Sequence, residues 1–220
     1  MNDLTDAFLL TYAGLFPIVN PVGGAPIFLG LTRRCTAPER HALARRVAVN
    51  SFFLLLGSLF AGSYVLELFG ITLPVVRIGG GTAVVALAWK LLNGDELTSD
   101  QRAAGDTGRA VPPTDAFYPL TMPLTVGPGS IAVAITLGSQ RPKAETGLEH
   151  LAPLGGAAVV GILAIAITIY ACYRSAERVV AALGASGTTV LVRLSAFILL
   201  CIGIQIVWNG YSALVGITTP

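Results

Sequence analysis

The sequence predicts an all-α polytopic membrane protein whose six transmembrane helices form a 3+3 inverted repeat, with helices 1 and 4 broken. Three observations support this prediction: a low content of charged residues, six long apolar segments, and landmarks that recur in the same order in two halves of the chain. We expect residues 1–220 to form a single transmembrane domain, with repeat 1 at about 1–94, a linker at about 95–114 and repeat 2 at about 115–220.

Composition excludes an ordinary soluble domain. Only 12% of the residues are charged and 54% are hydrophobic, whereas a soluble domain has about 25% charged residues. A water-soluble fold with so few charges could not cover its surface with polar groups. The chain has no run of basic residues, so we expect no nucleic-acid partner. Its three cysteines lack metal-ligand spacing, and we expect no metal and no cofactor.

Six apolar segments are long enough, or nearly so, to cross a bilayer, which takes about 20 helical residues. They lie at residues 7–32, 47–69, 72–93, 116–139, 151–173 and about 190–216. Residues 179–189 are also apolar, but this stretch is short and contains Gly184 and Gly187. We expect it to be a connection or a surface helix.

The first and fourth segments contain residues that interrupt a helix. Three prolines and a glycine pair fall within residues 16–28, and three prolines and two glycines fall within residues 118–130. Proline removes a backbone donor and glycine weakens a helix. The freed polar groups are tolerated in a membrane only where protein buries them or where they line a wet cavity. Two interrupted segments at matching positions indicate the binding site of a transporter.

The internal repeat is visible in the sequence itself. Asp6-Ala7-Phe8 opens the first segment and Asp115-Ala116-Phe117 opens the fourth. Arg77 opens the third segment sixteen residues before Asn93, and Arg193 opens the sixth at the same distance before Asn209. Because each half contains an odd number of crossings, the two halves must be inverted relative to each other.

Arginine and lysine residues predict the orientation, because cytoplasmic loops are enriched in them. The connections after segments one, three and five contain Arg33, Arg34, Arg40, Arg45, Arg46, Arg102, Arg109, Arg174 and Arg178. The opposite connections contain Arg141 and Lys143. We therefore expect the first set to be cytoplasmic and both termini to lie outside the cytoplasm.

The two interruptions are the candidate substrate site. A half-helix that starts inside the membrane exposes unpaired N–H groups and the positive end of its dipole, which favour an anion. Unwound carbonyl groups suit an ammonium group, so a zwitterionic amino acid fits both. The candidate substrate-binding residues are Asn20, Pro21, Val22, Gly23, Gly24, Thr125, Gly127, Pro128, Gly129 and Ser130. The alternative is a purely structural role, in which the prolines only kink tightly packed helices.

Individual polar residues of the site keep two interpretations each. Asn20 can donate to a carboxylate, or it can cap the half-helix that follows. Thr121 and Thr125 can face a substrate, or they can bond back to their own helix. Ser130 is the better hydroxyl candidate because it follows Gly129, where a half-helix would restart.

Two charged pairs are candidates for gating or structural ion pairs. The predicted topology places Asp6 and Arg77 at the outer side, and Asp115 and Arg193 at the inner side. An arginine inside a membrane is costly unless it is paired or reaches the interface. We therefore hypothesise the pairs Asp6–Arg77 and Asp115–Arg193, with arginines that reach lipid headgroups as the alternative.

The sequence resembles the MarC family of membrane proteins. The resemblance rests on residues 20–32 and 122–131, together with Arg77-Ile78-Gly79-Gly80 and Arg193, and it spans essentially the whole chain. It implies a bacterial or archaeal inner-membrane protein with six crossings and, for some members, transport of small neutral amino acids such as glycine and alanine. Ser130 departs from the family pattern, in which a small apolar residue is more usual at this position.

We therefore expect a transporter that moves a small neutral amino acid across the inner membrane by alternating access. The apolar segments contain no His cluster, carboxylate pair or Ser-His-Asp set, so we do not expect an enzyme. A channel-like facilitator and a transporter of a phosphate-bearing lipid carrier or headgroup are the alternatives. The expected partners are the substrate, the lipid bilayer and further copies of the chain in a homo-oligomer; a proton or Na⁺ is the candidate coupling ion.

Overall fold

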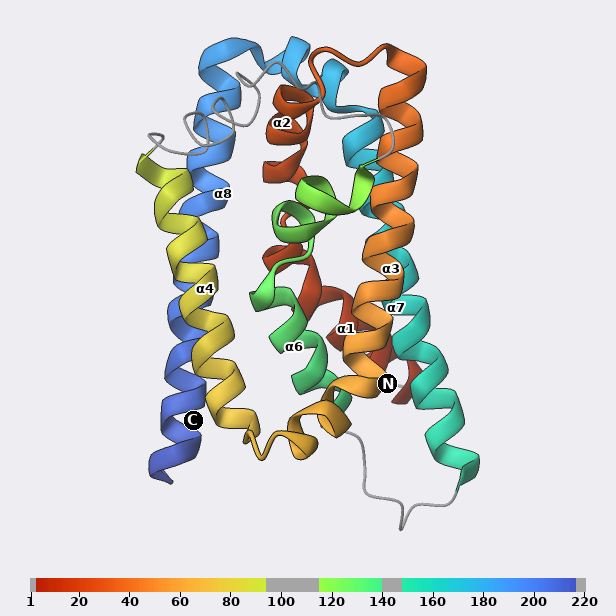
Figure 1. Cartoon of the computed structure of the whole chain (residues 1–220), viewed down its shortest axis with the longest axis vertical. Coiled ribbons are helices and arrows are strands. Elements are labelled where there is room, and N and C mark those ends of the chain that lie inside the picture. Colours follow the sequence, from red (N-terminus) through yellow and green to blue (C-terminus); the bar gives the residue numbers. More distant parts are fainter. Residues whose placement is uncertain (1–2, 94–114, 140–147, 217–220) are drawn as a thin grey trace.

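The computed structural model describes residues 3–93, 115–139 and 148–216, and in these ranges the chain is helical between short connections, with no strand. The helices are α1 (Asp3–Val19), α2 (Pro21–Leu31), α3 (Ala37–Leu68), α4 (Leu73–Asn93), the π-helical segment η1 (Ala116–Thr125), α6 (Pro128–Ser139), α7 (Leu148–Arg174) and α8 (Ala176–Val215). They form an elongated bundle (Figure 1).

Four of the described helices, α3, α4, α7 and α8, are long and apolar enough to cross a membrane. The pair α1 and α2 passes the same test as one unit bent by 40°, and the pair η1 and α6 as one unit bent by 70°. The described part of the chain therefore has four clear spans, and six if each bent pair is one span. The predicted breaks in helices 1 and 4 are confirmed.

The second span begins earlier than the apolar segment predicts. We expected it at residue 47, but α3 starts at Ala37. Glu39 explains the start, because its Oε2 accepts hydrogen bonds of 2.8 Å from both the backbone N–H and the hydroxyl group of Thr36. This reciprocal cap begins a helix whose polar first turns lie before the apolar part. Apolar length therefore predicted the membrane-crossing part of α3 and missed its polar start.

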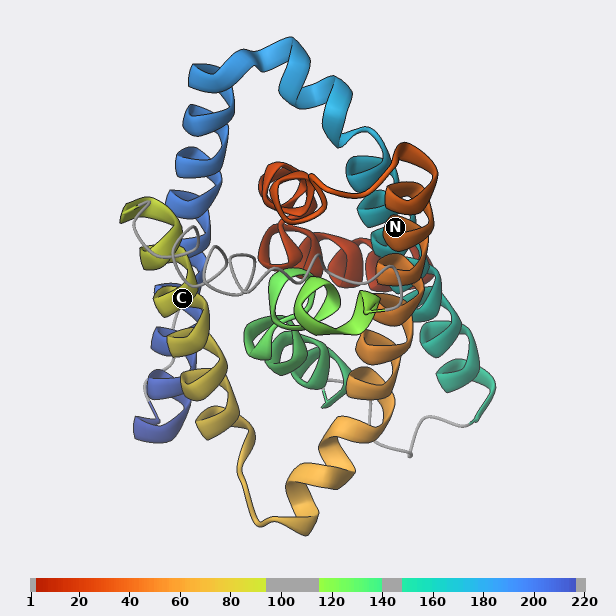
Figure 2. The same ribbon diagram turned by 45° about the horizontal axis from the view of Figure 1, so that its top comes forward.

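The stretch at 179–189 is helical and continuous with the last span. α8 starts at Ala176 and contains a break at Gly184, where φ is 66°. Glycine accepts this left-handed backbone without strain. Figure 2 shows the first part of α8 crossing one end of the bundle before the rest runs beside α4. Residues 179–189 are therefore helical, as one of the two expectations had it, but they are part of α8 and do not form a separate helix.

The broken pairs lie between two pairs of long helices. In Figures 1 and 2, α4 and α8 flank them on one side and α3 and α7 on the other. α4 and α8 approach closely, because a Cβ added at Gly81 would lie 2.9 Å from the carbonyl oxygen of Gly203. Small residues permit such close contact between membrane helices. The largest buried cluster joins α1, α2, α3, η1, α6 and α7, so the breaks are surrounded by protein.

Candidate functional site

The half-helices α2 and α6 begin near the middle of the bundle and run in opposite directions. Figure 1 shows α2 rising to the end that carries the α2–α3 connection, and α6 descending to the opposite end. Each starts with a proline, Pro21 in α2 and Pro128 in α6. Proline suits this position because the first N–H of a helix has no partner within the helix. Two positive helix ends therefore lie in the interior of the bundle.

Asn20 forms the first break by capping α2. Its backbone is left-handed, with φ 47° and ψ 55°, a conformation that asparagine tolerates better than most residues. Its Oδ1 accepts a hydrogen bond of 3.1 Å from the N–H of Gly23, and its carbonyl oxygen accepts one of 2.9 Å from the N–H of Gly24. The capping interpretation of Asn20 is therefore confirmed. Its Nδ2 has no hydrogen-bond partner among the described residues, so donation to a ligand stays a prediction.

The cap determines which backbone donors remain at the first break. Pro21 has no N–H, and Asn20 engages those of Gly23 and Gly24. The amide of Val22 is the one first-turn donor that the cap leaves. The side chain of Val22 is 38% exposed, whereas Pro21, Gly23 and Gly24 are buried.

The second break has no side-chain cap. Val126 is extended, and its N–H donates to the carbonyl oxygen of Thr121 at 2.8 Å. The carbonyl oxygen of Gly127 accepts hydrogen bonds from the Ser130 hydroxyl at 2.9 Å and from the Ile131 N–H at 3.1 Å. Gly127 has no side chain to accept from the amides of Gly129 and Ser130. The second break therefore presents more uncapped backbone donors than the first.

The threonines of η1 bond back to their own helix, as one of the two interpretations predicted. The Thr121 hydroxyl donates to the carbonyl oxygen of Ala116 at 2.8 Å, and the Thr125 hydroxyl lies 2.7 Å from the carbonyl oxygen of Leu120. This spacing of five residues matches the wide turns of η1. Thr125 is only 2% exposed, and its contact with a substrate stays a prediction.

Tyr173 on α7 connects the two breaks, and the sequence did not predict this role. Its hydroxyl group lies 2.8 Å from Oγ1 of Thr125, at the end of η1. Its ring stacks on Phe28 of α2, with ring centroids 4.5 Å apart. A Cβ added at Gly24 would lie 2.9 Å from the same hydroxyl group. The only signal in the sequence was a tyrosine within an apolar segment, where its hydroxyl needs a buried partner.

Glycines at both breaks allow close packing. A Cβ at Gly23 would lie 2.8 Å from Cβ of Ser195 on α8. A Cβ at Gly129 would collide with Val84 and lie 3.2 Å from the carbonyl oxygen of Gly80 on α4. Close packing therefore explains in part why glycine stands at these positions. Their contact with a substrate stays a prediction.

The hypothesised ion pairs are not formed in this structure. Within the described residues, the one ion pair joins Arg40 to Glu177. Neither Asp6–Arg77 nor Asp115–Arg193 is paired. Arg77 lies on α4 against Gly210 of α8, while Asp6, Asp115 and Arg193 are exposed. Placing residues at the same side of a membrane does not place them on adjacent helix faces, which is why the topology argument was insufficient.

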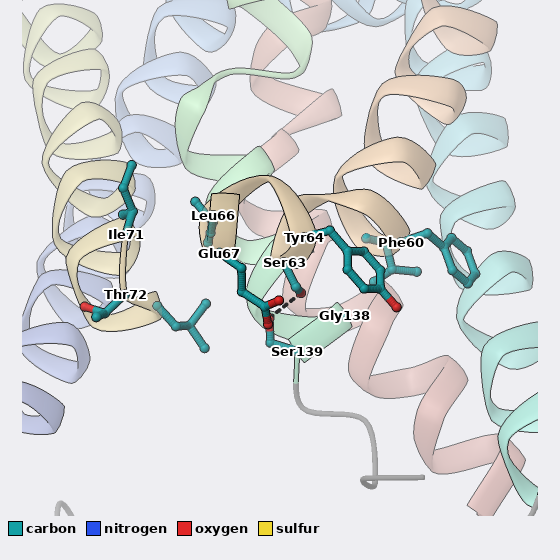
Figure 3. Close-up of a pocket in the computed structure, with 11 residues that line it drawn as sticks. Phe60, Ser63, Tyr64, Leu66, Glu67, Ile71, Thr72, Gly138 and Ser139 are labelled. Carbon is teal, nitrogen blue, oxygen red and sulfur yellow. Dashed lines mark hydrogen bonds between the residues drawn. The ribbon is translucent and has the colours of Figure 1, made fainter. Parts of the chain in front are cut away.

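A pocket of about 520 Å³ lies away from both breaks, at the far end of α6 (Figure 3). Its polar lining comes from Ser63, Tyr64, Glu67, Thr72 and Ser139. The hydroxyl groups of Ser63 and Ser139 are 2.8 Å apart. Among the described residues, no group of three or more His, Cys, Asp or Glu side chains could hold a metal ion.

Apolar helices of membrane-spanning length, two of them broken inside the bundle, define a polytopic integral membrane protein. Comparison with known proteins gives the family. The family model described as "MarC family integral membrane protein" matches residues 5–215, so the chain belongs to the MarC family.

The curated relatives cover nearly the full length of the chain. It is 31% identical over 214 residues to the UPF0056 inner membrane protein MarC of Salmonella typhimurium, covering 96% of each chain. It is 30% identical over 209 residues to the UPF0056 membrane protein YvbG of Bacillus subtilis, covering 94% of this chain and 95% of the relative. No solved structure matches the chain.

Proposed function

We propose that the protein transports small neutral amino acids, such as glycine or alanine, by alternating access, with its substrate site between the two breaks. The observation that carries this proposal is the position of α2 and α6, which both start inside the bundle with a proline as their first residue. Broken helices of this kind form the substrate sites of many secondary transporters.

The two breaks supply the two kinds of group that an amino acid needs. The uncapped amides of Gly129 and Ser130, at the positive end of α6, suit the carboxylate. Nδ2 of Asn20, which has no partner among the described residues, would orient it. The last turn of α1 ends at Val19. The carbonyl oxygen of Phe16 accepts from the Asn20 N–H, and the carbonyl groups that follow it in this turn have no partner within the helix. These carbonyls and the Ser130 hydroxyl would accept from the ammonium group.

The packing of the helices is consistent with the inverted repeat that alternating access would use. α3 packs on α7 and α4 packs on α8, as a two-fold relation between the halves requires. α6 packs on α3 and α4, and α2 packs correspondingly on α7 and α8. We propose that α1 to α4 form one repeat and that η1 to α8 form the other. Rocking of one repeat against the other would open the site to each side in turn.

The orientation and assembly belong to the same proposal. The α2–α3 and α7–α8 connections lie at one end of the bundle in Figure 1. Arg33 and Arg34 lie in the first of them, and Arg174 is the last residue of α7 before the second. We place this end in the cytoplasm of a cell with an inner membrane, with both termini outside. A homo-oligomer in the bilayer is the proposed assembly.

The test is amino-acid counterflow in proteoliposomes, after a thermal-shift screen of the purified protein. We expect glycine or alanine to raise the melting temperature, and internal unlabelled amino acid to drive saturable uptake of the labelled one. Uptake that does not saturate would replace the transporter with the channel-like facilitator. Binding of phosphate-bearing headgroups without any response to amino acids would favour the lipid-carrier alternative. Imposed proton or Na⁺ gradients would then identify a coupling ion.

A further inference from the structure

Arg40 is a buried charge that lies outside the proposed substrate site. It belongs to the first turns of α3, and its side chain is 9% exposed. Its Nη2 donates to the carbonyl oxygens of Thr32 at 3.2 Å and Cys35 at 3.0 Å, and its Nε donates to Oγ1 of Thr32 at 3.2 Å. Its Nη1 forms the ion pair with Glu177. A single guanidinium group thus binds the end of α2, the α2–α3 connection and the first turn of α8.

These bonds hold the half-helix that carries the first break. Thr32 is the C-terminal cap residue of α2, and a cation is favourable at the negative end of a helix. The 11 residues of α2 span about 16 Å at 1.5 Å per residue, so Arg40 acts at the end of α2 opposite to Asn20. An interior charge with this many partners is costly to release, because its remaining partners would be left without their hydrogen bonds.

A continuous set of contacts runs from Arg40 to the second break. The Thr32 hydroxyl donates to the carbonyl oxygen of Phe28 at 2.8 Å. Phe28 stacks on Tyr173, whose hydroxyl group lies 2.8 Å from that of Thr125. The first of these contacts lies within α2, and the other two join α2 to α7 and α7 to η1, so a shift of α2 at Thr32 reaches both breaks through packed side chains.

Glu177 joins this arrangement to the other half of the chain. It lies in the first turn of α8, where a negative charge is favourable, and its side chain is 55% exposed. The bond to Glu177 can therefore exchange with water more easily than the buried bonds of Arg40 to α2. Loss of Glu177 would loosen the contact with α8, whereas loss of Arg40 would release α2 itself.

We propose that Arg40 is a positioning residue of the broken-helix site, which holds α2 in place from its C-terminal end and, through Glu177, against the start of α8. We call this role of Arg40 the anchor. It rests on the proposed function only for the identity of the ligand that the site binds. From the sequence, we expected Arg40 to be one of several arginines in the cytoplasmic connections. Its burial in the structure is what distinguishes it from them.

Cys35 reports on the anchor directly. It is half-buried in the α2–α3 connection, and its carbonyl oxygen accepts from Arg40. The experiment replaces Cys172 and Cys201 by alanine and measures the rate at which a maleimide labels Cys35. Burial and then the Glu39 carboxylate raise the pKa of Cys35, while the charge of Arg40 lowers it. Removing that charge alone would slow labelling, so faster labelling reports exposure.

We expect Arg40→Met to increase the labelling rate of Cys35 severalfold. Arg40→Lys should give an intermediate increase, because an ammonium group cannot reproduce the forked geometry of the guanidinium group. Glu177→Gln should give a smaller increase. Arg45→Gln is the matched control, because Arg45 is an exposed arginine on the same helix, and it should change nothing. Equal rates in Arg40→Met and the parent, or an equal rise in Arg45→Gln, would overturn the anchor.

A second reporter at the other end of α2 tests the positioning role. In a background with all three native cysteines replaced by alanine, Val22→Cys places a thiol in the first turn of α2. We expect Arg40→Met to change its labelling rate severalfold as well. If only Cys35 responds, Arg40 clamps its own loop and does not position the break. Should Arg40→Met fail to fold, Arg40→Lys and Glu177→Gln carry the same two measurements. If the parent binds no amino acid, the proposed function fails while both labelling results still decide the anchor.

Discussion

The two breaks share one arrangement but differ in how their backbone N–H groups are hydrogen-bonded. At the first, Asn20 adopts a left-handed backbone and its side chain caps α2, with a bend of 40° between α1 and α2. At the second, Gly127 stands in the cap position, the wide turns of η1 are interrupted by non-helical backbone at Tyr118 and Met122, and the bend is 70°. Both half-helices then continue with a proline, Pro21 or Pro128.

The comparison shows that a cap and a ligand site compete for the same donors. A side-chain cap engages first-turn N–H groups that would otherwise bind an anion. The first break therefore satisfies most of its own first-turn N–H groups. The second break leaves its N–H groups available to a ligand. We infer that an anionic group binds chiefly at the start of α6, with Asn20 contributing through Nδ2. Substitutions at four positions test this difference.

The largest effect is expected from Gly129→Ala. The added methyl group would collide with Val84 and crowd the carbonyl oxygen of Gly80, so α6 must move away from α4. Overpacking of this kind costs about 1–3 kcal/mol, and the displaced amides should abolish counterflow. Gly79→Ala is the control, because a Cβ at Gly79 meets open space. Normal counterflow in Gly129→Ala would show that the start of α6 is not part of the site.

The next largest effect separates the two roles of Asn20. Asn20→Ala removes the cap and leaves a left-handed backbone without local polar support, which should lower the free energy of unfolding by roughly 2 kcal/mol. Asn20→Asp keeps the acceptor for the Gly23 N–H but replaces the Nδ2 donor by a negative charge. We expect Asn20→Asp to melt near the parent temperature while its half-saturation concentration for amino acid rises at least tenfold. An unchanged half-saturation would leave Asn20 with the capping role alone.

Tyr173→Phe tests the connection between the breaks. It removes the hydroxyl group that meets Thr125 and keeps the ring that stacks on Phe28. The lost hydrogen bond should cost about 1 kcal/mol, and transport should slow because η1 is no longer tied to α2. Tyr12→Phe is the matched control, since Tyr12 meets Thr168 of α7 at 3.2 Å through the same pair of groups. Equal loss of transport in both variants would remove any special role for Tyr173.

Tyr173 also shows where reasoning from sequence stops. Proline and glycine act on their own backbone, so both breaks and the half-helices after them were predictable from local sequence. The cap by Asn20 and the back-bonding of Thr121 and Thr125 were among the stated alternatives for the same reason. Contacts between distant helices were not predictable. They depend on which face of each helix turns inward. This is why the roles of Tyr173 and Arg40 were missed, and why the pairs Asp6–Arg77 and Asp115–Arg193, which are not formed in this structure, stay a hypothesis.

The smallest effect should come from Gly127→Ser, and it tests the comparison most directly. A serine in the cap position would give the second break the kind of side-chain acceptor that Asn20 gives the first. Its Cβ would lie 3.2 Å from the carbonyl oxygen of Pro123, a contact that a small shift relieves. The new cap should stabilise the fold by only about 0.3 kcal/mol, because glycine is itself an acceptable N-cap residue, while it competes with the substrate carboxylate for the amides of Gly129 and Ser130. We therefore expect a slightly higher melting temperature together with weaker amino-acid binding, measured on the same preparation. Gly57→Ser, in open space on α3, controls for an added hydroxyl group. If Gly127→Ser bound substrate more tightly, the uncapped amides of α6 could not be the carboxylate site, and the division of roles between the breaks would have to be reversed.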